Sequence, residues 1–441
     1  MLSKNALHEE KNTPADINHI HHPPLAAEMI HHLDHPDRLE ELFRSNEMEF
    51  RTAFETIYPE IKSHPIAQFW NARLNFKLPS TATRFGKQPW VILFLCLFSG
   101  CVAKLPDWLG WDENAFFQRN LAFVIFPALM AYWSIQRRTS WTTKFIVAAV
   151  CLVCVVFINA LSPNDLTDSV LLACIHLPVV LWFLWGMLFS VRDGKVSDIN
   201  IEFLKHNGEL LVLSGLLLLT GGLITAVTLA LFELIGVRAE TFYFRHIAVW
   251  GLASIPLVAT YLIGLYPPLV RQISPVIAQL VTPLVLIMLL IYLGAIVYTK
   301  HNPYDDRQFL MLFNVLLIGV LAIILFSVAE SSAAQLKSRR LILLFALAML
   351  TVLLNGIALS AIVFRIHAWG ITPNRLAVLG CNVMVLLQLL WVTVQMSKVL
   401  WRGKSVVLIH QSLTQYLKYY AIWALGLTIL FPLCFDLWKI W

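Results

Sequence analysis

Residues 169–190 read SVLLACIHLPVVLWFLWGMLFS and hold no Asp, Glu, Lys or Arg. A helix needs about 20 mainly apolar residues to cross the hydrocarbon core of a bilayer, and this run supplies them. Further apolar stretches of similar length follow one another from residue 89 onward. The sequence therefore predicts an all-α, polytopic transmembrane helix bundle with about eleven spans. They lie near 89–105, 119–135, 143–161, 169–190, 208–235, 247–267, 276–299, 309–328, 340–364, 374–400 and 418–437.

The composition agrees, because 58% of the 441 residues are hydrophobic and only 14% are charged. Soluble domains are about 45–50% apolar and about 25% charged. Acidic residues and histidines concentrate before Lys87. We therefore expect a disordered, His-rich tail at 1–36 and a cytoplasmic or interfacial helical region at 37–88. The multi-span transmembrane domain is expected at 89–441.

Lys and Arg residues concentrate in alternate joints between the spans, for example at Arg137 and Arg138 and again at Arg339 and Arg340. The positive-inside rule places these joints in the cytoplasm, which predicts a cytoplasmic N-terminus and a C-terminus on the other side. The first span ends in Lys104, whose long side chain can reach the headgroup layer. Because the basic residues are dispersed at segment ends, we expect membrane lipids and no nucleic acid as partners.

Histidines are frequent in the N-terminal tail. Clustered imidazoles suit Zn, Ni or Cu, so the tail contains candidate ligands for a transition metal, namely His21, His22, His31, His32 and His35. The alternative is a solvated tail of biased composition, and no other cofactor is indicated. Apolar residues between 37 and 78 recur at helical spacing. Because this region is short, we expect no core of its own but a helix on the cytoplasmic face or in the interface, where it can dock a protein partner.

Few ionisable residues fall inside the spans, where they are costly and so become candidates for function. His176 lies in mid-span close to Pro178, and Glu233 lies near the end of another span. Pro178 frees the backbone carbonyl of Cys174, and His176 can donate a hydrogen bond to a nearby helix. A structural role for His176 is the alternative to a proton relay. The scarcity of carboxylates in the spans argues against an ion-coupled transporter.

The joint between the ninth and tenth spans has readable turn chemistry. Gly370 permits a tight turn after one helix. Thr372 is a suitable N-cap and Pro373 a suitable first helical residue, which predicts that the tenth span starts at Pro373. Arg365 complements the C-terminal dipole of the ninth span, whereas Arg375 lies in the first turn of the tenth, where a positive charge opposes the helix dipole.

Something acidic is therefore expected beside Arg375, such as a lipid phosphate, a ligand or a carboxylate. The nearest carboxylates in the predicted topology are Asp305 and Asp306, in another joint on the same side. They also fit a cation site with His301, or a solvated turn with an N-capping aspartate. The candidate ligand-binding residues of this outer face are Arg365, His367, Trp369, Thr372, Asn374, Arg375, Asp305 and Asp306.

The same segment resembles the signature of an uncharacterised bacterial family of polytopic inner-membrane proteins, domain of unknown function 4153. The matching residues are Arg365, Ile366, Trp369, Gly370, Ile371, Thr372, Asn374 and Arg375. The family usually has tyrosine where Trp369 stands, and often an acidic residue where Pro373 stands. The resemblance covers about the C-terminal two-thirds of the chain. It implies a multi-pass protein of the bacterial inner membrane and supplies no activity.

Three functions fit these observations. The first is a transporter or permease-like protein for a small or lipidic solute, which requires a cavity and broken helices in the membrane. The second is a scaffold or sensory subunit, which requires an exposed apolar patch on residues 37–78. The third is a membrane enzyme acting on a lipid-linked substrate at the outer face, which requires Arg365, Arg375, Asp305 and Asp306 to meet. The sequence contains no phosphate-binding loop, paired-histidine zinc motif or nucleophile elbow, so we assign no catalytic residue and do not expect an enzyme.

Overall fold

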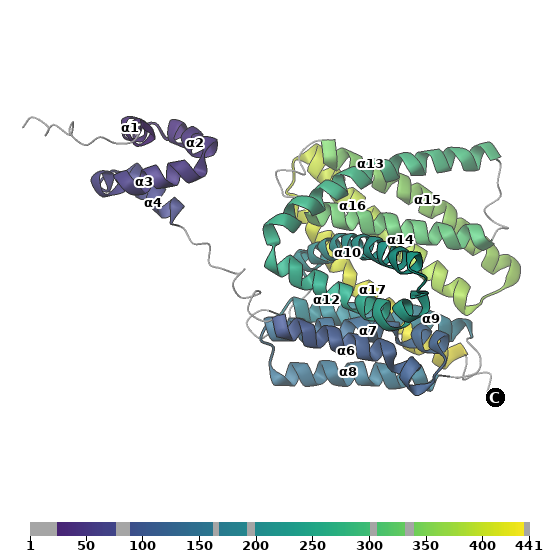
Figure 1. The fold of residues 1–441 in the computed structure, drawn as a ribbon. Helices are drawn as coiled ribbons and strands as arrows, with labels where there is room; N and C mark the ends of the chain where they lie inside the picture. Colours follow the sequence, from purple (N-terminus) through teal and green to yellow (C-terminus); the bar gives the residue numbers. More distant parts are fainter. Residues whose placement is uncertain are drawn as a thin grey trace, which may run out of the picture. The chain divides into compact units, whose positions relative to one another are not determined.

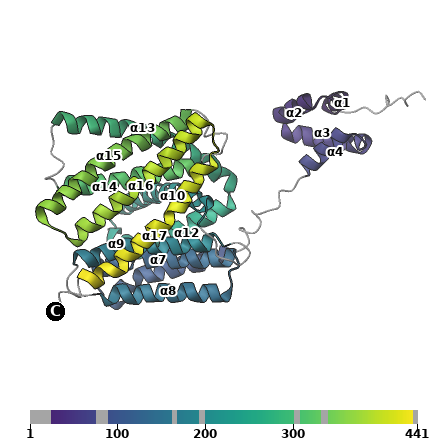
Figure 2. The ribbon, with the colours of Figure 1, turned by 180° about the vertical axis from the view of Figure 1, so that it is seen from behind.

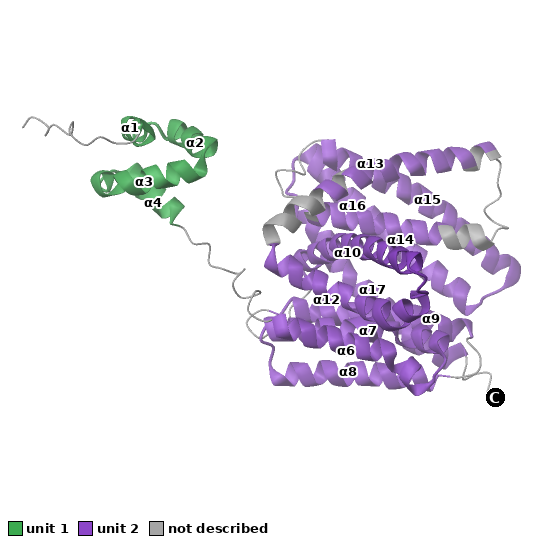
Figure 3. Ribbon diagram, viewed as in Figure 1, with its two compact units in different colours: residues 1–81 green, residues 82–441 purple. Residues whose placement is uncertain are grey.

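The computed structural model describes residues 24–75, 89–161, 167–191, 199–299, 307–330 and 339–435. Every regular element in these residues is a helix, so the predicted all-α class is confirmed. The chain divides into two compact units, residues 1–81 and 82–441, which Figure 3 shows in different colours.

The N-terminal unit has a hydrophobic core of its own, and the expectation that this region lacks one is wrong. Its helices bury twelve apolar side chains, among them Phe50, Ile57 and Trp70. Part of the core comes from Ala26 and Met29, in a helix inside the stretch expected to be a disordered tail. The helices are α1 (Pro24–His31), α2 (Pro36–Ser45), α3 (Glu47–Ile61) and α4 (Pro65–Leu74).

The second unit is a bundle of long apolar helices (Figures 1 and 2), and the chain is a multi-pass integral membrane protein. Nine of its described helices are long and apolar enough to cross a membrane, and two more, α13 and α14, contain the shorter apolar segments Leu280–Ala295 and Phe313–Ala329. Each of the eleven expected spans thus has its helix. They are α6 (Pro89–Leu109), α7 (Glu113–Gln136), α8 (Trp141–Ala160), α9 (Asp168–Phe189), α10 (Ile201–Leu234), α12 (Val249–Leu265), α13 (Pro267–Thr299), α14 (Arg307–Glu330), α15 (Arg339–Trp369), α16 (Pro373–Arg402) and α17 (Val407–Phe435).

Side-chain caps fix where many of these helices begin. In each case the oxygen of a short polar side chain accepts a hydrogen bond from the backbone N–H three residues later, which satisfies a donor that has no partner within the helix. The N-cap residues are Asp112 for α7, Ser140 for α8, Thr167 for α9, Asn200 for α10 and Thr372 for α16. The span that follows α10 begins differently, with the short helix α11 (Glu240–Tyr243) and a π-helical turn, η1 (Phe244–Ala248).

The spans alternate in direction, and two glycines serve to name the two ends of the bundle. Gly370 links α15 to α16 with a φ of +79°, and Gly403 ends α16 with a φ of +61°. Both values lie in the left-handed region that glycine adopts without steric cost. At the Gly370 end, α6, α8 and α15 finish and α7, α9 and α16 start. At the Gly403 end, α7 and α16 finish and α8 and α17 start.

The bundle packs around two apolar clusters. One joins α14, α15, α16 and α17, and the other joins α6, α7, α8 and α9. The closest helix pairs are α9 with α17, α15 with α16, and α6 with α12. Gly100 of α6 lies directly against the indole ring of Trp250 of α12, which explains how closely the last pair approaches.

Candidate functional site

The turn between α15 and α16 is built as the sequence predicts. The Oγ1 atom of Thr372 accepts a hydrogen bond from the backbone N–H of Arg375 at 3.3 Å, and Pro373 is the first helical residue. Gly370 adopts the positive φ given above. The turn therefore holds the side chains of α15 and α16 in a fixed relation at the Gly370 end.

Arg375 has a partner other than the expected acidic one. Its Nη1 atom donates to the backbone oxygens of Trp369 and Gly370, at 2.7 Å each. These oxygens lie at the C-terminus of α15, which carries the negative end of that helix dipole. The positive charge in the first turn of α16 is thus offset by the helix before it.

Arg365 is placed differently, although it shares an aromatic neighbour with Arg375. The Cζ atoms of Arg365 and Arg375 lie 5.1 and 5.9 Å from the ring centroid of Trp369. The Nη1 atom of Arg365 is buried and has no hydrogen-bond partner among the described residues. Asp305 and Asp306 lie outside the described residues. His367 is exposed on α15.

Four of the predicted residues line one cleft of about 430 Å³: Arg365, Thr372, Asn374 and Arg375. Two polar residues that the sequence did not suggest join them there, Asp168 at the start of α9 and Asn314 of α14. Nothing in the sequence connects these two positions with the α15–α16 turn, because only the packing of α9 and α14 brings them there. The cleft combines two guanidinium groups, one carboxylate and two amides, and it is referred to below as the polar cleft.

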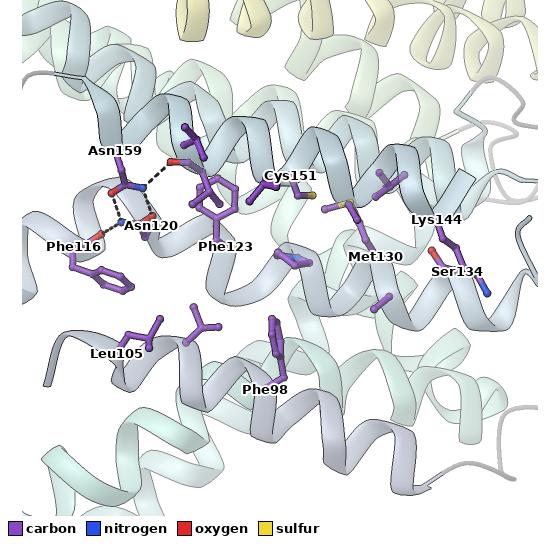
Figure 4. Close-up of a pocket in the computed structure, with 18 of the residues that line it drawn as sticks. Phe98, Leu105, Phe116, Asn120, Phe123, Met130, Ser134, Lys144, Cys151 and Asn159 are labelled. Carbon is purple, nitrogen blue, oxygen red and sulfur yellow. Dashed lines mark hydrogen bonds between the residues drawn. The ribbon is translucent and has the colours of Figure 1, made fainter. Parts of the chain in front are cut away.

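A larger groove of about 1000 Å³ lies between α6, α7 and α8 (Figure 4). Its walls are mainly apolar, with Phe98 of α6, Phe123 and Met130 of α7, and Cys151 of α8. The lining positions of α8 recur every three or four residues from Lys144 to Asn159, so one full face of the helix borders the groove. It is referred to below as the apolar groove.

The polar groups of the apolar groove gather at its two ends. At the Gly370 end the amides of Asn120 and Asn159 bond reciprocally, with Nδ2–Oδ1 distances of 3.0 and 2.8 Å (Figure 4). At the Gly403 end are Ser134 of α7 and Lys144 of α8. With a rise of about 1.5 Å per residue, the two polar ends are about 21 Å apart, most of the thickness of a hydrocarbon core.

An ion-pair network joins α6 to the π-helical turn η1. Lys104 is 4% exposed. Its Nζ atom donates to Asp107 Oδ2 at 2.5 Å and to the backbone oxygen of Arg245 at 2.8 Å. Arg245 donates to the other oxygen of Asp107, from Nε at 2.8 Å and also from Nη2. Lys104 is therefore buried among these partners at the end of α6.

The two predicted intramembrane residues take part in no shared site. The Nδ1 atom of His176 lies 2.8 Å from the backbone oxygen of Leu172, so the histidine donates within its own helix and not to a neighbour. Glu233 is exposed at the end of α10. Neither residue lines the apolar groove or the polar cleft.

Three of the candidate metal ligands lie near one another in the N-terminal unit. The ring centroid of His32 is 4.8 Å from that of His31 and 6.0 Å from that of His35. His21 and His22 lie outside the described residues. Within the described part of the chain, no three His, Cys, Asp or Glu side chains are placed to share a metal ion. The transition metal stays a prediction.

Comparison with protein-family models, with curated proteins and with solved structures gives no match for this chain. Membership of the family named above therefore stays a prediction that rests on the segment from Arg365 to Arg375.

Proposed function

We propose that this chain is a transporter or permease-like protein for a lipidic solute, and that the apolar groove is its binding site. The observation that carries the proposal is the groove itself, an apolar cavity between α6, α7 and α8 with polar groups only at its ends. A cavity that follows the membrane-spanning helices is what a permease requires and what a scaffold does not need.

The lining of the groove favours an acyl chain over a polar solute. A polar molecule entering it would lose its hydrogen bonds to water and regain few from the walls. An acyl chain has no hydrogen bonds to water that it could lose, and it gains dispersion contacts with Phe98, Phe123 and Met130. The length of about 21 Å exceeds one leaflet of a bilayer, so an occupant that fills the groove reaches past the midplane.

The orientation follows from the positive-inside rule, and we propose it together with a bacterial inner-membrane location. Arg137, Arg138 and Lys144 lie at the Gly403 end, which makes this the cytoplasmic end. The Asn120–Asn159 pair then faces the periplasmic side. Lys144 at the cytoplasmic end of the groove favours a solute with an anionic head, because the head can stay at the membrane surface while the chain fills the groove.

The two other functions receive less support from the geometry. An enzyme at the outer face needs Arg375 free for a substrate, but its Nη1 atom is bound to the end of α15. A scaffold needs an exposed apolar patch on the N-terminal unit, where Met48 and Phe69 are the large apolar side chains found exposed in the described helices. Two exposed side chains are fewer than such a patch requires.

Filling the groove tests its role in binding. Ala148 lines the groove, whereas Val153 lies on the opposite face of α8 and is 66% exposed. We expect Ala148→Trp to reduce the lipid that co-purifies in mild detergent, measured by mass spectrometry of the intact protein. Val153→Trp adds the same ring outside the groove and is expected to leave the bound lipid unchanged. Equal retention by both variants would contradict the proposal.

Transport is tested separately in vesicles that contain the purified protein. A fluorescent single-chain lipid is added to the outer leaflet, and its appearance in the inner leaflet is followed by a quencher outside. We expect the protein to accelerate transfer, and Ala148→Trp to slow it while Val153→Trp does not. Transfer at the rate of protein-free vesicles would refute the transport part of the proposal and leave the binding part to the preceding test.

A further inference from the structure

The polar cleft holds two buried polar atoms without a partner, and they differ in kind. Nη1 of Arg365 is a donor and Oδ1 of Asn314 is an acceptor, and neither has a hydrogen-bond partner among the described residues. Buried polar groups are nearly always satisfied in folded proteins, so each such exception needs an explanation. Both residues line the same cleft of about 430 Å³. A molecule in the cleft that offers both an acceptor and a donor would satisfy them together.

The charges of the cleft are also of both signs. Asp168 is the first residue of α9, and its carboxylate borders the cleft together with the guanidinium of Arg365. No ion pair between these two side chains occurs in the structure. Arg375 is already held by two backbone oxygens. The cleft therefore presents one positive and one negative group to a ligand, which suits a zwitterion.

A polarity gradient runs along the cleft, and three helices share it. Near the Gly370 end the lining is polar, with Asn314 on α14, Arg365 on α15, and Asn374 and Arg375 on α16. One turn farther from the Gly370 end, each helix contributes an aliphatic residue to the same lining, namely Ile318, Ile362 or Val378. The cleft is thus polar at the end of the bundle and apolar deeper in it. This matches an amphiphile whose head lies at the membrane surface and whose chain points inward.

The geometry points to a binding site for a phospholipid whose head carries a primary ammonium group. Arg365 donates to the phosphate, Asp168 pairs with the ammonium, and Asn314 accepts one of its N–H groups. Ile318, Ile362 and Val378 contact the first part of the acyl chain. A head with a quaternary ammonium lacks N–H donors and leaves Asn314 unsatisfied, so the site discriminates between the two kinds of head.

This site is independent of the apolar groove, because α9, α14, α15 and α16 form the cleft and α6, α7 and α8 form the groove. A free headgroup, such as phosphoethanolamine, offers the same polar chemistry without the chain. The aliphatic floor favours the complete lipid. The test therefore includes both the lipid and its isolated head.

The full-length protein is reconstituted in vesicles with equal amounts of phosphatidylethanolamine, phosphatidylcholine and phosphatidylglycerol. It is then extracted in mild detergent, and the retained lipids are quantified by mass spectrometry. We expect phosphatidylethanolamine to be enriched over phosphatidylcholine by roughly tenfold, the effect of one or two hydrogen bonds to charged groups. Free phosphoethanolamine at millimolar concentration is expected to leave this ratio unchanged. Displacement by it would overturn the role of the chain.

Substitutions in the polar cleft test whether the retained lipid binds there. Arg365→Gln and Asn314→Leu are each expected to return the ratio to that of the vesicle. Arg402→Gln, at the exposed Gly403 end, is the control and should keep the ratio. Asp168→Asn should abolish the preference for phosphatidylethanolamine over phosphatidylglycerol. An unenriched wild type, or enrichment that survives both Arg365→Gln and Asn314→Leu, would overturn the inference.

The control for the other cavity is Ala148→Trp. It is expected to lower the total retained lipid without changing the preference for phosphatidylethanolamine. Loss of the preference in Ala148→Trp would assign the discriminating site to the groove and overturn its assignment to the cleft. The failure of one site thus remains distinguishable from the failure of the other.

Discussion

Arg375, in the first turn of α16, bonds to the backbone oxygen of Trp369 at 2.7 Å and so holds the end of the helix before its own. The charge that opposes one helix dipole is placed on the negative end of another. The same guanidinium reaches the oxygen of Gly370. The α15–α16 hairpin is therefore closed by one side chain in addition to the cap at Thr372.

Arg375→Gln should weaken this closure. We expect a loss of about 2 kcal/mol in the free energy of unfolding, because a charged donor that satisfies two backbone oxygens is removed. The measurement is reversible unfolding by SDS in mixed micelles. Arg402→Gln, which changes an exposed arginine at the other end of α16, should have little effect. Equal stabilities of the two variants would show that the hairpin does not depend on Arg375.

In the ion-pair network at η1, a substitution that removes one charge should lower the free energy of unfolding more than a double substitution that removes two opposite charges. Asp107→Asn leaves the buried ammonium of Lys104 without its carboxylate, and we expect the free energy of unfolding to fall. The double variant Lys104→Met, Asp107→Leu removes both charges and should be more stable than Asp107→Asn. Glu233→Gln, at the exposed end of α10, is the control. A double variant that is less stable than Asp107→Asn in the same assay would contradict this account.

Substitution by alanine should change the free energy of unfolding in opposite directions at two glycines that lie within helices. A Cβ atom on Gly100 would overlap the indole ring of Trp250, so Gly100→Ala should destabilise by about 1–3 kcal/mol through overpacking. Gly215 has open space at the same position and lies in the interior of α10. Gly215→Ala should therefore stabilise by about 0.5–1 kcal/mol. The prediction fails if both substitutions change the unfolding free energy with the same sign.

The N-terminal unit should lose stability in acid through Glu40. Hydrogen bonds from Arg73, and then from Arg44, lower the pKa of Glu40 below its ordinary value of 4.5. A lowered folded-state pKa gives stability that is present above the unfolded-state pKa and is lost as the pH falls through the folded-state pKa. Arg73 approaches Glu40 at 2.6 and 3.2 Å, so α2 and α4 separate more easily once the carboxylate is protonated.

Hydrogen exchange of peptides from α2 and α4 in the full-length chain measures this effect. At neutral pH the wild type should be better protected than Glu40→Gln, and at about pH 3 the difference should shrink. The exposed Glu55 provides the control, since Glu55→Gln should exchange like the wild type at both values. A difference that is as large in acid as at neutral pH would mean that the ionised carboxylate is not its source.

The length of the apolar stretches predicted that the spans are present but not where their first helical turns begin. The span expected at 208–235 starts at Ile201, and the one expected at 418–437 starts at Val407. The early turn of α10 is helical although it is polar, because His206 is 6% exposed and lies with its ring centroid 5.2 Å from that of Trp133. A criterion that counts apolar residues misses polar residues that other helices bury.

The turn could be predicted because its residues act on their close neighbours in the sequence. The cavities could not be predicted, because they form only when distant segments pack together. Gly370 and Thr372 act within a few residues of their own positions, so their roles can be read from the sequence. Asp107 and Arg245 lie 138 residues apart, and Asn120 and Asn159 lie 39 apart. No local pattern marks such pairs. For the same reason, the sequence suggested Arg365 as a ligand-binding residue but not Asn314.

The most direct test of the lipid-binding groove uses a phospholipid with a photoactivatable group near the middle of its acyl chain. The protein is reconstituted with this lipid and irradiated, and the modified residues are mapped by peptide mass spectrometry. We expect the labels to concentrate on exposed residues that line the groove, such as Phe98, Leu152 and Val156. Lipid-facing residues outside the groove, such as Val153 of α8 and Leu223 of α10, should carry few. Labels spread evenly over all exposed helix faces would contradict it.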